Sequence, residues 1–105
     1  MKFAAVSASA SGDNEIVAGV NGKRIRLLSG LLSFSGTVNA KWRSGTTDVS
    51  GLYYGTLGPP FPFQPGPIGP GGRTPHLQTA PGEALNLNLS GATAVGGHIV
   101  YEEVP

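Results

Sequence analysis

Residues 84–90, ALNLNLS, alternate leucine with asparagine or serine, and this alternation is the strongest local pattern in the chain. Successive side chains of a β-strand point to opposite faces, so the pattern predicts a strand with one buried and one solvated face. No window of the sequence shows a sustained apolar stripe at helical spacing, and glycine interrupts the chain every few residues. Together these features predict an all-β fold.

Other segments carry similar strand and turn signals. Asn21-Gly22 is a dipeptide that tolerates positive φ and strongly favours a hairpin turn. Roughly six to eight short strands separated by such turns are typical of an antiparallel β-sandwich or jelly roll. Besides residues 84–90, the predicted strands span residues 15–20, 23–35, 37–43, 49–54 and 98–104, and order is expected to resume at residues 76–79.

The segment 23–35, KRIRLLSGLLSFS, is expected to be the core strand. Its apolar residues fall on both faces of a regular strand: Ile25, Leu27 and Leu31 on one, Leu28, Leu32 and Phe34 on the other. Two interpretations remain open. The strand is central and packed on both sides, or a bulge near Gly30 exchanges its faces midway.

The chain of 105 residues predicts a single domain over residues 13–105. Residues 1–12 are rich in small side chains and are expected to form a flexible N-terminal arm that lies loose or contacts a neighbouring subunit. The apolar run from Phe3 to Val6 is too short for a signal peptide. Phe3 and Val6 are therefore candidate partner contacts.

Residues 55–75 are predicted to form a long loop inserted into the domain. Most of the nine prolines lie there, together with several glycines. Collagen is excluded because its triplet register fails after two repeats, and a disordered linker fits poorly because strands flank the segment. A P-x-x-P ligand remains possible. We favour a stiffened contact loop, since long loops in compact domains are usually functional. Its candidate contacts are Phe61, Phe63, Pro65, Ile68 and Arg73.

Charge and composition argue against several function classes. The chain has a formal net charge of +1 and 12% charged residues, which is too little to predict nucleic-acid binding. Cysteine is absent, and no segment approaches the length of a membrane-spanning helix. His76 and His98 lack a recognisable nucleophile or metal-ligand pattern, and Asp48 and Glu83 fit turn positions. We therefore expect no enzyme activity, no cofactor and no metal site.

Exposed aromatic rings offer an alternative, a module that binds host surface carbohydrate on a tail or fibre. Tyr53 and Tyr54 alternate, so only one of them can share a surface with Phe61 and Phe63. Trp42 alternates with apolar residues and is expected in the core.

Three strings in the chain resemble a family of small structural proteins of tailed bacteriophages: NGKRIRLLSGLLSFSG, VNAKWRSGTTDVSGLYY and TAPGEALNLNLSGATAVGGHIVYEEV. The resemblance covers residues 14–104, and residues 57–73 depart from it by being richer in proline. It implies a jelly-roll virion component, and proteins of this size in virions commonly decorate capsids as trimers. The expected partners are further copies of the chain and the major capsid protein, on the outer capsid surface.

Overall fold

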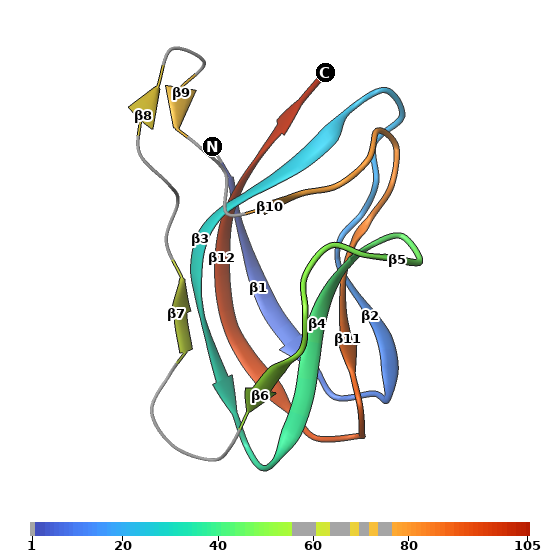
Figure 1. Cartoon of the computed structure of the whole chain (residues 1–105), viewed down its shortest axis with the longest axis vertical. Coiled ribbons are helices and arrows are strands. Elements are labelled where there is room, and N and C mark those ends of the chain that lie inside the picture. Colours follow the sequence, from blue (N-terminus) through green and yellow to red (C-terminus); the bar gives the residue numbers. More distant parts are fainter. Residues whose placement is uncertain (1, 56–60, 64–67, 70–71, 74–76) are drawn as a thin grey trace.

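The computed structural model describes residues 2–55, 61–63, 68–69, 72–73 and 77–105. Two antiparallel sheets face each other, as Figure 1 shows, and in the described residues there is no helix. Sheet I has the order β1 (Lys2–Ala8), β12 (Val95–Val104), β3 (Arg24–Phe34) and β10 (Leu77–Gln78), with β7 (Phe61–Phe63) also paired to β3. Sheet II has the order β2 (Gly12–Val17), β11 (Leu85–Leu89), β4 (Val38–Ser44) and β5 (Thr47–Asp48), with β6 (Tyr53–Gly55) also paired to β4. The β-sandwich prediction is confirmed.

The connectivity is that of a jelly roll. Strands of the first half of the chain pair with strands of the second half in reverse order: β1 with β12, β2 with β11, β3 with β10 and β7, and β4 with β6. Successive members of this nested series alternate between the two sheets. The chain is therefore a long antiparallel ribbon folded over into a double sheet, which is the arrangement expected of jelly rolls.

The core lies between the inner faces of the sheets. Trp42, Leu85 and Leu87 are 0% exposed and Leu89 is 1% exposed. The alternating residues of β4 and β11 thus place their apolar side chains inside the sandwich. The core cluster comprises Val6, Ala8, Val17, Ile25, Leu27, Leu32, Phe34, Val38, Ala40, Trp42, Leu85, Leu87, Leu89, Val95 and Ile99.

A bulge explains the apolar residues on both faces of β3. Tyr101 of β12 pairs with Leu27, whereas Val100 pairs with Ser29, so Leu28 is an extra residue in β3. Inward-facing positions are odd-numbered before this point and even-numbered after it, as at Leu32. Of the two interpretations of this strand, the face-exchanging bulge is confirmed, and it lies at Leu28, next to the expected position.

Residues 2–8, expected within a flexible arm, instead form the strand β1. All seven residues pair in register with β12, from Lys2 opposite Tyr101 to Ala8 opposite Val95. The pattern KFAAVSA alternates across the strand, and its inward side chains join the core. The prediction of an arm was wrong because small residues were taken as a sign of looseness, whereas here they form one edge of a sheet.

Several strand boundaries differ from the prediction, and β2 begins at Gly12 instead of residue 15. β2 ends at Val17, three residues earlier than predicted, and beyond it residue 19 lies so close to the turn at residue 82 that a Cβ at Gly19 would be 2.4 Å from the Gly82 carbonyl oxygen. β12 begins at Val95, three residues earlier than predicted, and within this added part Gly97 lets β12 approach β3 closely. Of the predicted strand 49–54, only Tyr53 and Tyr54 lie in a strand, β6, and residues 49–52 lie outside both β5 and β6.

The described part of the 55–75 segment contains short paired strands. β7 continues sheet I beside β3, with Pro62 opposite Leu31. A proline fits there because β7 lies at the edge of the sheet, where one side of its backbone has no ladder partner. β8 (Ile68–Gly69) and β9 (Gly72–Arg73) pair only with each other and lie apart from both sheets (Figure 1).

Candidate contact surfaces

Most charged side chains on the outer face of sheet II bond to one another. Arg43 Nη1 lies 3.1 Å from Asp13 Oδ2, and Arg43 Nε lies 3.0 Å from Asp48 Oδ1. Lys41 Nζ donates to Asp48 Oδ2 at 3.1 Å, and Asn88 Nδ2 donates to Asp13 Oδ1 at 2.8 Å. The network spans β2, β11, β4 and β5, so these carboxylates hold strands together rather than converging on a cleft.

Glu83 is also engaged in the framework. Its Oε1 accepts a hydrogen bond from Ser44 Oγ at 2.5 Å, and Ser44 in turn accepts the Ala80 backbone N–H at 2.9 Å. Glu83 lies in the expected turn, where its N–H donates to the Ala80 carbonyl, but its side chain bonds to Ser44 of β4 and not to a nearby backbone N–H. Asp48 lies in β5 and forms ion pairs with β4 instead of capping a turn.

His76 and His98 were the histidines considered as possible catalytic bases or metal ligands. His98 is exposed on β12, and His76 lies outside the described residues. In the described part of the chain, no three His, Cys, Asp or Glu side chains are close enough to hold a metal ion. The same residues include no helix long and apolar enough to cross a membrane.

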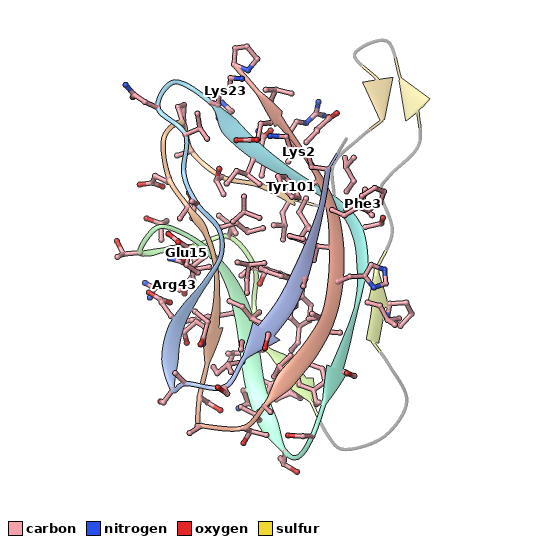
Figure 2. The ribbon with its side chains drawn as sticks, turned by 180° about the vertical axis from the view of Figure 1, so that it is seen from behind. Lys2, Phe3, Glu15, Lys23, Arg43 and Tyr101 are labelled. Carbon is pink, nitrogen blue, oxygen red and sulfur yellow. The ribbon has the colours of Figure 1, made fainter. Side chains whose placement is uncertain are left out.

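The outer face of sheet I carries a different surface, which we call the neutral patch. Two cross-strand rows form it: Phe3 beside Val100 and Ser29, and Ala5 beside His98 and Leu31. The neutral patch thus comprises Phe3, Ala5, Ser29, Leu31, His98 and Val100. The Phe3 side chain is 76% exposed, and Val100 and Leu31 are half-buried. Figure 2 shows Phe3 on this side, with Arg43 and Glu15 on the side of sheet II.

The predicted partner contacts are only in part at the surface. Phe3 is exposed, but Val6 is 3% exposed and belongs to the core, so the expectation that Val6 contacts a partner is wrong. The reason is the strand geometry of β1, which turns residues 3 and 6 to opposite faces.

The contacts predicted on the proline-rich segment are placed by their backbones alone. Phe61 and Phe63 are the ends of β7 and pair with Leu32 and Gly30 of β3. Ile68 pairs with Arg73 across the β8–β9 hairpin. Pro65 lies outside the described residues.

The aromatic platform of the carbohydrate alternative is divided between the two sheets. Tyr54 is 77% exposed at the edge of sheet II, whereas Tyr53 packs against the core. β7, which carries Phe61 and Phe63, belongs to sheet I. The expectation that one of the two tyrosines is exposed is met by Tyr54.

Sequence reasoning missed the neutral patch itself. Its signal is present in KFAAVSA, where residues 3, 5 and 7 share a face with no charge. Assembling the patch also requires β12 and β3, whose pairing with β1 joins the two ends of the chain. Only the nested topology brings these rows together.

The fold and its surfaces define a small jelly-roll β-sandwich: the outer face of sheet II is charged and internally bonded, and the outer face of sheet I carries the neutral patch next to the Arg26–Glu102 ion pair. No protein-family model, no curated protein and no solved structure matches this chain.

Proposed function

We propose that the chain is a structural protein of a bacteriophage virion, a decoration (cement) protein that binds the assembled capsid shell. It sits on the outer capsid surface as a homotrimer, where subunits of the major capsid protein meet, and stabilises their junctions. The resemblance of its strand and turn strings to phage structural proteins suggests this role. The jelly-roll topology agrees with it, since viral capsid domains commonly use this architecture.

The neutral patch is the observation that carries the proposal. Phe3 is exposed beside half-buried Val100 and Leu31, in two rows of side chains without a formal charge. Burying such a surface against a shell stabilises the contact without desolvating unpaired ions. One patch is small, but many copies on one shell, each contacting several capsid subunits, add their binding energies.

Phe3 and Tyr54 provide a matched pair of variants for the test. Both rings are about equally exposed, at 76% and 77%, and they lie on different sheets. Capsids lacking the protein are mixed with wild type, Phe3→Ser or Tyr54→Ser, and bound copies are counted by gel densitometry. We expect hundreds of copies of wild type and Tyr54→Ser per particle, and at least a tenfold weaker affinity for Phe3→Ser. Failure of wild type to bind the shell would refute the proposal.

A second candidate function rests on Tyr54. Its exposed ring is opposite Asn39 in the β6–β4 ladder, and Lys41 follows two residues further along the same face. A planar ring beside amide and ammonium groups can bind a sugar, as a tail or fibre module would. The same variants test this function. Tens of copies per virion, and host-cell binding lost with Tyr54→Ser but kept with Phe3→Ser, would favour it over the decoration role.

A further inference from the structure

β1 is an edge strand that lacks the usual protection against pairing. It is seven residues long and runs in unbroken register with β12, and among the residues that the structure describes no strand lies beyond it in sheet I (Figure 2). Alternate residues of an edge strand direct backbone N–H and C=O groups away from the sheet, which makes the strand a template for another. From Phe3 to Ala8 the strand contains neither a charge nor a proline.

The other described edges are each protected. β2 carries Asp13 and Glu15, and its ladder with β11 contains a register shift. β5 and β10 are only two residues long, and β6 and β7 only three. Asp48 lies in β5 and Pro62 in β7. Charges, bulges, prolines and short length are the devices that keep sheet edges from pairing, so β1 stands apart from all of them.

We propose that β1 pairs antiparallel with β1 of a second copy of this chain, around a two-fold axis that passes beside Ala5. The two copies of sheet I then form one continuous sheet across the interface. This inference deepens the self-association in the proposed function, and it does not depend on the shell. Combined with the three-fold contact of the proposed homotrimer, this two-fold contact joins trimers in pairs, so the protein in solution contains an even number of chains.

Side-chain size favours this register. With Ala5 opposite Ala5 of the second copy, Phe3 lies opposite Ser7 of that copy, and Ala4 lies opposite its Val6. Each large side chain thus faces a small one. Outward residues continue the neutral patch across the axis, while Ala4 and Val6 continue the core face.

Charge favours the antiparallel orientation. Lys2 is the only charged residue of β1, and it forms an ion pair with Glu103 of its own chain. In the antiparallel register, Lys2 of one copy lies opposite uncharged Ala8 of the other. A parallel pair in register would place the two lysines side by side, where like charges repel.

The test introduces a charge at the axis. Ala5 is exposed and points outward, so Ala5→Lys and Ala5→Glu leave the core untouched, and circular dichroism verifies their fold. Ala92→Lys, at an exposed bend, makes the same substitution away from the edge. Mass is measured for the purified protein by light scattering and sedimentation. We expect wild type and Ala92→Lys to contain an even number of chains, and each Ala5 variant alone to show a twofold lower mass.

Mixing the two Ala5 variants examines the register directly. Lysine and glutamate then face each other at the axis, and we expect the mixture to regain the wild-type mass. A monomeric or odd-numbered wild type, a mass unchanged by both Ala5 substitutions, or a mixture that stays dissociated would each overturn the proposed pairing. Because capsids are absent from the experiment, these outcomes are independent of whether the protein decorates a shell.

Discussion

Glu83 Oε1 lies 2.5 Å from Ser44 Oγ, and this contact joins the turn after β10 to the end of β4. Ser44 is 2% exposed and also accepts the Ala80 N–H. Thr79, which directly precedes Ala80, bonds to the other sheet: its Oγ1 accepts the Ile25 N–H at 2.9 Å, and its N–H donates to the Ile25 carbonyl at 2.9 Å. The segment TAPGEA is thereby hydrogen-bonded to both sheets: Thr79 bonds to β3 of sheet I, and Ala80 and Glu83 bond to β4 of sheet II.

We expect Ser44→Ala to destabilise the fold by about 1–3 kcal/mol, because it removes a buried hydroxyl that donates to Glu83 and accepts the Ala80 N–H in a part-buried contact. Urea unfolding measures the change. Ser7→Ala, at an exposed position of β1, is the matched control and should stay within about 0.5 kcal/mol. Equal effects of the two substitutions would show that the Ser44 contacts contribute nothing to stability.

Two adjacent glycines of β12 should differ strongly in how much stability is lost when each is replaced by alanine. Gly97 has φ +138°, and a Cβ there would meet the Leu31 carbonyl oxygen at 1.9 Å. We expect Gly97→Ala to cost about 3 kcal/mol or more, or to prevent folding, because backbone must move. At Gly96 the nearest atom would be Ser33 Oγ at 3.7 Å, so Gly96→Ala should change stability by less than about 1 kcal/mol. Thermal unfolding of both variants checks this, and a tolerated alanine at residue 97 would contradict the close β12–β3 approach.

The strands of this fold were predictable where alternation was regular. β4 and β11 were found within one residue at each end because apolar inward residues alternate regularly with polar outward residues along nearly the whole of each strand. β1 was missed because Ala and Ser carry too little hydrophobic contrast to mark a strand, and its order comes from pairing with β12. Which strands neighbour each other was beyond the sequence pattern, since it depends on contacts between distant parts of the chain.

The surfaces were less predictable than the fold. Exposure of Phe3 was anticipated, but burial of Val6 three residues later follows only once β1 is known to be a strand. The ion-pair network of Arg43 was also hidden, because Asp13 is far from Arg43 in sequence and reaches it only through β2–β11–β4 pairing.

The network at Arg43 should be modest in strength and sensitive to salt. Asp13 is partly exposed and bonds to both Arg43 and Asn88, so we expect Asp13→Ala to destabilise by about 0.5–1.5 kcal/mol at low ionic strength. Added salt should reduce the difference from wild type, because it screens exposed charges. Urea unfolding at about 0.02 M and 0.5 M NaCl measures this. Asp13→Asn is the control that keeps an acceptor for Asn88, so it should be milder. A loss for Asp13→Ala that is unchanged by salt would mean that packing, not charge, is responsible.

The pairing of Lys2 with Glu103 should be visible in the titration of the lysine. The hydrogen bond to Glu103, and then its charge, raise the pKa of Lys2 above the ordinary value of 10.5. A pKa raised by folding means that this contribution to stability is complete below the unfolded pKa and disappears as pH rises through the folded one. We therefore expect the pair to stabilise β1 at neutral pH and to lose its effect in alkali. Nuclear magnetic resonance of the Lys2 side chain should give a lower pKa in Glu103→Gln than in wild type. Glu102→Gln, which removes the partner of Arg26, should leave the Lys2 titration unchanged. A pKa that is the same in wild type and Glu103→Gln would show that the contact is absent in solution.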